Sequence, residues 1–573
     1  MTQWIALKFN LLATSLFMTI VLALAFVGGQ AMPLRQGLAP TVVGRGWLRD
    51  TCLGLLAVAV FVLPVPAYWL SAHTHPNAIA GLLPWADGLV YFYCADEIVT
   101  GTPIEVICRM RPFYSGFFAT IFEISGRDLQ LALLIQAAVI GGGAYLLLRE
   151  VGRQLSAAAQ LAVFSALFLF AAEFCDALVL TENAGLLLGT IGIAILWRDA
   201  GTITPRAFFV AMFFLAVGQN ARGGAFLILP TLLAWAYFIK ERPVPERRSL
   251  AGAGALGIAA GFLTTFALIW IYGGTGDTFQ SNFSYILYGL TKGGATSYQI
   301  HIDHPEFFAD VPEELELTRR IYGAAFANVI AEPHLLLFGY AKGLVQYFGH
   351  LFNFVRFMPL RAVFIVLWVA GLAAAWRDRR AARAAMLLWI AVGVFLSSPA
   401  LTFNGGNRLY AVTFPADAIL AGLGIAALEG LIARRWPQGS SDVGVALTPS
   451  RALPIAGLFA IVAAFAAPLA ARFGEASAPV KSAACPPEQE SVIVHAGRET
   501  PILSLVREGN ERIYPLAVSA EDFARRFDRW TFDPESLRQA PGTSFVWGFR
   551  MPVWRCPSVE RVLPDNGTLR PAD

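Results

Sequence analysis

The stretch PWADGLVYFYCADEIVTGTPIEVICRMRPFY, residues 84–114, is a polar and charged insert between two strongly hydrophobic segments. Asp87 and Tyr91 lie four residues apart, so a short helix would place the carboxylate and the phenol on one face. Arg111 follows where the chain has turned back towards the next hydrophobic segment. An acid near the start of this insert and a cation near its end can therefore face each other across a cleft at a membrane surface, where chemistry can take place.

The composition around this insert is that of an integral membrane protein. The chain has 573 residues, of which 56% are hydrophobic and 14% charged, and its mean hydropathy is +0.57. A soluble protein would carry about 25% charged residues. The net charge of +3 is small, and Lys and Arg occur in small groups between apolar segments, so nucleic acid is not an expected partner.

Twelve apolar segments have close to the ~20 residues that a helix needs to cross the ~30 Å hydrocarbon core of a bilayer, although the segment 206–219 is short. The expected fold is therefore mainly α, a polytopic membrane protein of about twelve transmembrane helices with a small α+β extracytoplasmic domain at the C-terminus. The predicted spans are residues 9–29, 51–71, 128–148, 156–177, 182–198, 206–219, 223–239, 252–273, 360–376, 383–399, 409–431 and 452–472.

Basic residues predict the orientation of these spans. Arginines and lysines gather in the short loops 30–50, 240–251 and 432–451, which the positive-inside rule places in the cytoplasm. Both termini and three long segments, 72–127, 274–359 and 473–573, are then outside, which in a bacterial inner membrane is the periplasmic side. The organisation expected is an extra N-terminal span and cytoplasmic loop (1–50), a transmembrane domain (51–472) and a soluble outer domain (473–573).

The first span could instead be a cleaved signal peptide, because Lys8 precedes an apolar run and small residues follow it. The arginines at positions 35, 45 and 49 favour a retained span that starts outside.

The outer segment 274–359 is rich in glycine, with Gly289, Gly293 and Gly294 in its centre. We expect this glycine-rich core to be too flexible for a regular element, and the segment to act as a mobile lid in which residues 288–298 close over the donor or acceptor. Residues 334–356 alternate apolar and aromatic positions with a few cations, which is typical of a helix lying in the membrane interface. The soluble segment contains short β-type runs, at 491–495 and 543–547, and one helical run, at 520–530.

Six cysteines are present, and four of them, Cys94, Cys108, Cys485 and Cys556, fall in the outer segments, where oxidation is allowed. Proximity in the sequence favours the pairs Cys94–Cys108 and Cys485–Cys556, although sequence alone cannot fix the pairing. No CxxC motif or Cys/His cluster indicates a metal site. We therefore expect no metal and no cofactor, and the sequence does not support a divalent ion.

Four charged residues, Asp87, Glu182, Arg222 and Arg408, gather at the outer ends of spans or in very short outer turns. A charge at membrane depth costs at least ~2.5–3.5 kcal/mol, so each needs a reason. Asp87 could merely cap a helix, Glu182 could complement a helix dipole, and the two arginines could extend to lipid phosphates. The neighbouring pair 96–97, Asp-Glu, is expected to be a solvated face. A functional site is favoured because all four charged residues are expected on the same face of the membrane.

Such a group of residues suits an enzyme that acts on a lipid phosphate. Arginines bind phosphate through paired hydrogen bonds, a carboxylate within reach serves as a general base, and aromatic rings suit sugar faces or a lipid tail.

The motifs resemble those of the GT-C superfamily of membrane glycosyltransferases, especially the lipid A aminoarabinose transferases and protein O-mannosyltransferases. The sequence Asp87-Gly88-Leu89-Val90-Tyr91 resembles the acid pair and tyrosine of their first periplasmic loop, and Arg111-Pro112-Phe113 resembles the basic residue and prolines that follow. Thr181-Glu182 and Asn407-Arg408-Leu409-Tyr410, with Pro415, resemble two further family positions. Gly88 replaces the second acid, and Arg111 replaces a lysine.

The resemblance implies transfer of a sugar, with inversion, from a polyprenyl-phosphate donor to a lipid, glycan or protein acceptor on the periplasmic face. It implies a role for Asp87 as general base. It assigns donor phosphate binding to Arg111, Arg222 and Arg408, and further substrate contacts to Tyr91, Glu182, Tyr114 and Tyr410.

Two other functions remain open from the sequence. A carrier or flippase for a lipid-linked or anionic substrate would use the outer arginines to bind phosphate without chemistry, and it would usually show an internal repeat, which is not visible here. A non-catalytic membrane scaffold would bind a partner through its outer domain, and Asp87 would then be dispensable.

Overall fold

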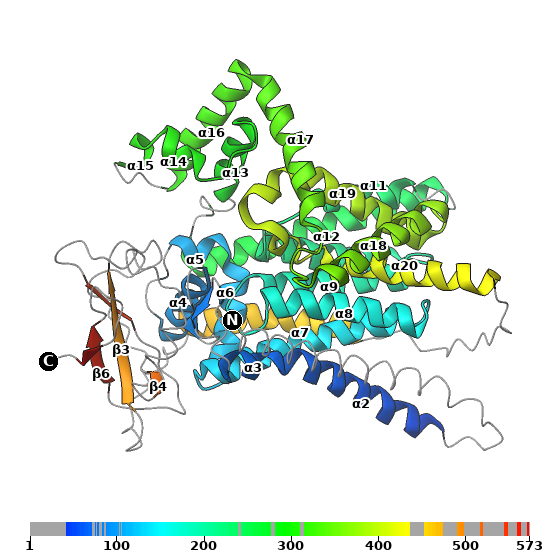
Figure 1. Cartoon of the computed structure of the whole chain (residues 1–573), viewed down its shortest axis with the longest axis horizontal. Coiled ribbons are helices and arrows are strands. Elements are labelled where there is room, and N and C mark those ends of the chain that lie inside the picture. Colours follow the sequence, from blue (N-terminus) through cyan, green and yellow to red (C-terminus); the bar gives the residue numbers. More distant parts are fainter. Residues whose placement is uncertain are drawn as a thin grey trace.

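The computed structural model describes residues 42–70, 87–101, 106–238, 242–274, 281–309, 314–435 and 452–473, some residues between 75 and 84, single residues at 104 and 276, and five strands between residues 490 and 571. Long helices run side by side and form a bundle, and helices α13–α16 are grouped beside it at one end of α17 (Figure 1). The expectation of a mainly helical membrane protein is confirmed.

The helices of the described residues are α2 (Val42–Val62), α3 (Pro64–Leu70), α4 (Asp87–Thr100), α5 (Val106–Met110), α6 (Pro112–Ile124), α7 (Leu129–Val151), α8 (Ala157–Phe174), α9 (Glu182–Asp199), α10 (Pro205–Ala221), α11 (Ile228–Phe238), α12 (Val244–Ile271), α13 (Asn282–Thr291), α14 (Gln299–Asp303), α15 (Glu306–Ala309), α16 (Glu314–Ala331), α17 (Pro333–His350), α18 (Met358–Arg377), α19 (Ala382–Gly405), the 3₁₀ helix η2 (Gly406–Tyr410), α20 (Phe414–Arg435) and α21 (Ala452–Phe473).

Within the described residues, eight helical segments are long and apolar enough to cross a membrane, so the count of twelve is not confirmed. The predicted first span, 9–29, lies outside the described residues. The predicted spans at 182–198, 206–219 and 223–239 correspond to α9, α10 and α11. Of these, α9 carries three charges in 18 residues and α11 has only 11 residues. The eight segments are Asp50–Tyr68, Leu129–Val151, Ala157–Phe174, Val244–Ile271, Met358–Arg377, Ala382–Phe403, Phe414–Leu431 and Ala452–Phe473.

Three of the bundle helices begin directly after a capping residue. Asp128 accepts a hydrogen bond from the backbone of α7, Ser156 from that of α8 and Thr204 from that of α10. Each side chain satisfies one of the amide groups that a helix leaves without a partner at its N-terminus. Helix α9 is surrounded, since every residue from Glu182 to Trp197 is buried. Its charged N-terminus is therefore enclosed by protein.

The glycine-rich segment 274–359 is more regular than expected, because most of it is helical. Helices α13–α17 occupy it, and residues such as Tyr288, Ile300 and Ile321 form a separate small apolar core. Gly293 and Gly294 have φ values of 72° and 78°, which glycine adopts more readily than other residues. The glycines thus shape a tight turn between helices and do not make the segment irregular. We name residues 282–331 the α13–α16 module.

The helix predicted at 334–356 is present as α17, and its position relative to a membrane interface stays a prediction. It meets α16 at an angle of 105°. Leu337, Phe338 and Val345 are exposed, whereas Gly339 and Gly343 are buried.

A short hairpin, β1 (Ala78–Ile79) and β2 (Leu83–Pro84), precedes α4. In the C-terminal segment, β3 (Glu490–Gly497) pairs antiparallel with β4 (Leu516–Val518) and β5 (Ser544–Trp547), and parallel with β6 (Ser558–Val562). Strand β7 (Arg570–Pro571) pairs with β6. The two predicted β-type runs correspond to β3 and β5. The helical run at 520–530 and the pair Cys485–Cys556 lie outside the described residues, so the α+β domain stays a prediction.

Candidate functional site

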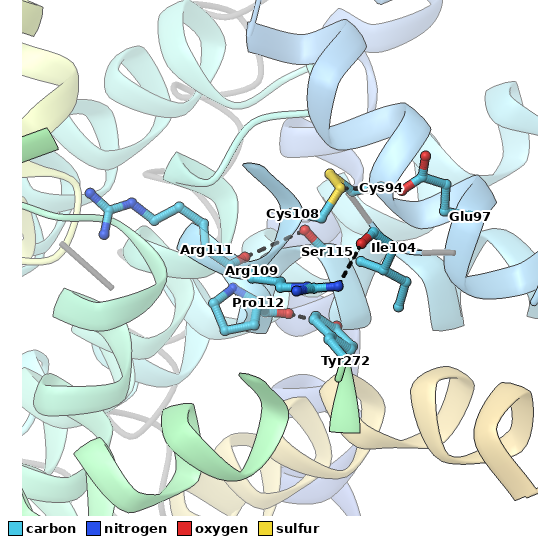
Figure 2. Close-up of a disulfide and its surroundings, with 9 residues drawn as sticks. All are labelled: Cys94, Glu97, Ile104, Cys108, Arg109, Arg111, Pro112, Ser115 and Tyr272. Atoms are coloured by element: carbon cyan, nitrogen blue, oxygen red, sulfur yellow. Dashed lines mark hydrogen bonds between the residues drawn. A yellow bond between two sulfur atoms is a disulfide. The ribbon is translucent and has the colours of Figure 1, made fainter. Parts of the chain in front are cut away.

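A disulfide joins the two helices of the insert that the sequence singled out. Cys94 of α4 and Cys108 of α5 are bonded, with a Cα–Cα distance of 5.4 Å, which confirms the predicted pair. Figure 2 shows that Arg109 and Arg111, just after Cys108, extend in opposite directions. The Arg109 side chain donates a hydrogen bond to the Ile104 carbonyl, at 3.1 Å. Arg111 extends away from the disulfide, and its side chain reaches the site described next.

Charged side chains from four separate segments meet at one end of the bundle. Arg408 of η2 lies 2.8 Å from the Asp87 carboxylate at the start of α4. Glu182, at the start of α9, lies 3.2 Å from the Arg222 guanidinium and 3.7 Å from that of Arg408. The sequence predicted that these charges gather on one membrane face, and they do lie together. The Glu182 carboxylate is 1% exposed and joins the two arginines from behind.

Glycines next to these charges allow the segments to approach closely. A methyl group at Gly185 would lie 2.9 Å from Cβ of Arg222, and one at Gly223 would lie 2.7 Å from Nη2 of Arg111. At Gly224 it would overlap the carbonyl of Leu409. The run Asn-Ala-Arg-Gly-Gly at 220–224 thus combines a cation with the space for a second cation beside it. In the sequence, the two glycines directly after Arg222 were the available signal that a bulky side chain such as that of Arg111 packs beside it.

The charged cluster alters the ionisation of its members. Burial lowers the pKa of the Arg111 guanidinium, and the charge of Arg222 also lowers it. Burial also acts to lower the pKa of Arg408, but Glu182 and Asp87 outweigh this effect and the pKa is raised. Burial and Asp87 raise the pKa of the Tyr91 phenol, which is neutral at ordinary pH. Arg111 stays protonated, and its cation is the least compensated of the three.

Several buried polar atoms of the cluster have no hydrogen-bond partner within the described part of the chain. They are Nη1 of Arg111, Nε and Nη2 of Arg222 and Oε1 of Glu182. The Arg222–Glu182 contact is therefore an ion pair without hydrogen-bond geometry. A buried donor without a partner costs about 1–3 kcal/mol, and more when it is charged. These arginine N–H groups are suited to bind an anion.

A cavity of about 490 Å³ opens in front of the cluster. Binding cavities for small molecules are typically about 300–1,000 Å³. One side is lined by Asp87, Arg111, Arg222 and Arg408, which we name the charged wall. Tyr91 also lines the cavity, between the charged residues.

The α13–α16 module supplies another part of the cavity lining, which was not predicted as a binding surface. Tyr285 of α13, Tyr298 just before α14 and His301 of α14 line it, and we name these three the aromatic wall. Residues 288–298 were expected to form a closing loop. The lining includes Tyr298 from that range but comes mainly from helices. The repeated aromatic residues between positions 282 and 301 were the available signal for a binding surface. They were not interpreted in this way because the segment was expected to be an irregular loop.

Three other predicted site residues do not line the cavity. Tyr114 is fully buried, donates a hydrogen bond to Gln136 at 2.9 Å and packs edge-to-face on Tyr91. Tyr410 is buried, and its ring packs against Tyr347 at a centroid distance of 5.4 Å. Glu182 lies behind the arginines. The structure thus places Tyr114 and Glu182 one layer behind the lining residues Tyr91 and Arg222.

The expectation that the pair Asp96 and Glu97 forms a solvated face is wrong. Their side chains lie in the buried part of α4, with residue exposures of 5% and 6%. The disulfide ties their helix to α5 and the rest of the insert packs around it, so this face of α4 points inwards.

No group of three or more His, Cys, Asp or Glu side chains among the described residues is arranged to hold a metal ion. The cluster has three arginines for two carboxylates, and this excess of cations suits an anion.

Comparisons with known proteins give limited similarity. No model of a protein family matches the sequence, and no curated protein matches it. Among solved structures, two crystal structures of the Archaeoglobus fulgidus oligosaccharyltransferase are similar. One carries a tethered acceptor peptide with the NVT sequon, and it is 13% identical with a TM-score of 0.39, covering 75% of this chain and 56% of that chain. The other, in complex with zinc and sulfate, is 14% identical with a TM-score of 0.38, covering 75% and 54%.

The chain therefore spans little more than half the length of the transferase to which it is similar. That protein is by its name an oligosaccharyltransferase.

Proposed function

We propose that the chain is a membrane glycosyltransferase of the GT-C type, which transfers a sugar from a polyprenyl-phosphate donor to an acceptor on the periplasmic face of a bacterial inner membrane. The observation that carries the proposal is the charged wall: three arginines and one carboxylate line a cavity of about 490 Å³ at one end of a bundle of apolar helices.

The charge balance favours a phosphodiester as the donor group. Three arginines and the two carboxylates, Asp87 and Glu182, leave one net positive charge in the cluster. A polyprenyl-phosphate sugar carries one negative charge on its phosphodiester and matches this balance, whereas a diphosphate carries two. The N–H groups of Arg111 and Arg222 that lack partners are the donors for the phosphate oxygens.

Asp87 is the base in this proposal. It lines the cavity and lies at the N-terminus of α4, where its carboxylate is half exposed. As the acceptor hydroxyl oxygen forms a bond to the anomeric carbon, its proton passes to Asp87. The bond from that carbon to the phosphate oxygen breaks, and the electron pair leaves on the lipid phosphate. Attack opposite to the leaving group inverts the anomeric centre.

The arginines stabilise the phosphate as its negative charge grows, so no general acid is needed for the leaving group. Glu182 holds Arg222 and Arg408 in place and neutralises part of their repulsion. Tyr91, whose pKa is raised, is a neutral donor beside the reacting groups. The acceptor is a lipid, a glycan or a protein.

Mass spectrometry of the lipids and glycans of the cell envelope tests the function. Cells that lack the protein are expected to lose one hexose or aminosugar modification and to accumulate the corresponding polyprenyl-phosphate sugar. The wild-type gene restores the modification. An unchanged envelope together with an unchanged pool of polyprenyl-phosphate sugars contradicts a transferase.

A further inference from the structure

The ring of His301 packs against both tyrosine rings of the aromatic wall. The ring of His301 is 5.9 Å from that of Tyr285, at an interplanar angle of 26°, and 5.9 Å from that of Tyr298, at 36°. Behind it, Phe308 stacks on His301 at 3.9 Å. The small core of the α13–α16 module supports the stack, because Tyr285 and Phe308 both pack against it.

This side of the cavity carries no charge among its described lining residues at neutral pH. Burial lowers the pKa of His301, so its imidazole is neutral. Asn282 adds a side-chain amide to the same lining. The Tyr298 ring is nevertheless 73% exposed, although it lies at the cavity. Flat rings together with an amide provide apolar faces and hydrogen-bonding groups in one place.

We propose that Tyr285, Tyr298 and His301 form the subsite for the sugar ring of the donor, an inference that rests on the proposed function. A sugar ring presents a flat face of C–H groups and a rim of hydroxyls. The C–H face packs on the aromatic rings, and the hydroxyl rim reaches the amide of Asn282.

The position of the wall favours the donor sugar over the two other parts of the reaction. The sugar is bonded to the phosphate, so a phosphate at Arg111 and Arg222 places the sugar in the cavity that the aromatic wall also lines. The acceptor must approach from Asp87, because its hydroxyl proton goes there. A hydrocarbon tail would leave the polar groups of Asn282 and His301 without partners, at a cost in free energy.

Binding measurements on the full chain in lipid nanodiscs test this inference. The probes are undecaprenyl phosphate and the same lipid phosphate carrying mannose, glucose or 4-amino-4-deoxyarabinose. The variants are Tyr298→Ala and His301→Ala, with Tyr298→Phe as the conservative change. Phe326→Ala is the matched control, because Phe326 is an exposed aromatic residue of α16 that does not line the cavity.

We expect both alanine variants to weaken binding of the sugar-bearing lipid that the wild type prefers by about tenfold, or about 1.4 kcal/mol. Binding of undecaprenyl phosphate should change less than twofold, and Tyr298→Phe and Phe326→Ala should resemble the wild type. Equal weakening for both kinds of lipid would show a lipid subsite and overturn the inference. Unchanged donor binding with a raised KM for the acceptor would also overturn it.

Failure of the proposed donor phosphate site would give a different pattern. The wild type would then bind none of the four lipids, and Arg222→Ala would change nothing. If the wild type binds undecaprenyl phosphate through Arg222 but shows no gain from any of the sugars, only the sugar subsite is wrong.

Discussion

The charged wall and the aromatic wall face the same cavity, but the chain builds them in different ways. The charged wall takes Asp87, Arg111, Arg222 and Arg408 from separate places in the sequence, each fixed at a helix end of the bundle. The aromatic wall comes from one stretch of the module, between residues 285 and 301. The difference suggests a division of labour: the bundle holds the reacting groups rigidly, and a module with its own core can vary the sugar subsite.

The largest expected effect is on the base of the charged wall. Asp87→Asn should lower the transfer rate by a factor of about 10²–10⁴, because the amide cannot accept the proton of the acceptor hydroxyl. Donor binding should remain, since the three arginines are unchanged. The measurement is the initial rate of sugar transfer, with Glu316→Gln as a control, because Glu316 is an exposed residue of α16 paired with Arg320. A variant that keeps more than about a tenth of the wild-type rate would exclude Asp87 as the base.

The second effect concerns Glu182, which pairs with two arginines of the charged wall, and it separates protein stability from donor binding. Glu182→Gln should reduce the free energy of unfolding by about 3–5 kcal/mol, because it leaves the buried Arg222 without its counter-charge and Arg408 with Asp87 alone. The double variant Glu182→Gln/Arg222→Gln should recover part of this loss, while donor binding stays weak. Chemical denaturation in detergent and lipid-binding titration measure the two effects. A loss below about 1 kcal/mol for the single variant would mean that Glu182 does not hold the wall together.

A smaller effect is expected from Gly223→Ala, which displaces the charge of Arg111 without removing it. The added methyl group of Gly223→Ala would displace the flexible end of Arg111, from which it would be only 2.7 Å away. We expect undecaprenyl phosphate to bind about tenfold more weakly at unchanged thermal stability, because one charge-assisted contact is lost. Gly142→Ala in α7 is the matched control, since no atom lies within 4 Å of its added methyl group. Equal affinities for both variants would place the phosphate away from Arg111.

The smallest effect concerns a buried carboxyl that lies six residues before Glu182 but outside the wall. Asp176 is 2% exposed, and neither of its oxygens has a hydrogen-bond partner among the described residues. Burial raises its pKa well above the ordinary value, so the folded protein prefers the protonated acid. This preference stabilises the fold below the unfolded pKa of about 3.9 and is lost as the pH rises through the folded pKa.

Asp176→Asn should therefore stabilise the protein at neutral pH, by about 1 kcal/mol, whereas Glu182→Gln destabilises it. The advantage of the variant should be absent near pH 4 and grow as the pH rises. Melting temperatures of both proteins in detergent at pH 4, 6 and 8 measure this trend. A destabilised Asp176→Asn at every pH would reveal a partner for the carboxylate.

Much of the charged wall was accessible from the sequence, and the aromatic wall was not. A charge at the end of an apolar span is expensive unless it has a partner, so Asp87, Glu182, Arg222 and Arg408 could be singled out and expected to meet. Which of them touch depends on helix packing, which periodicity does not specify, and Glu182 was therefore expected to contact substrate. In the module, glycines were interpreted as flexibility, because sequence alone does not show that Gly293 and Gly294 form a tight turn between helices.

The most direct measurement is a structure of the Asp87→Asn variant with a polyprenyl-phosphate sugar bound, determined by electron cryomicroscopy in nanodiscs. We predict that the phosphate lies within about 3.2 Å of the guanidinium groups of Arg111 and Arg222, with the sugar ring against Tyr298 and His301. A phosphate bound outside the cavity, or bound inside it without contact to either arginine, would contradict the central claim that the charged wall holds the donor.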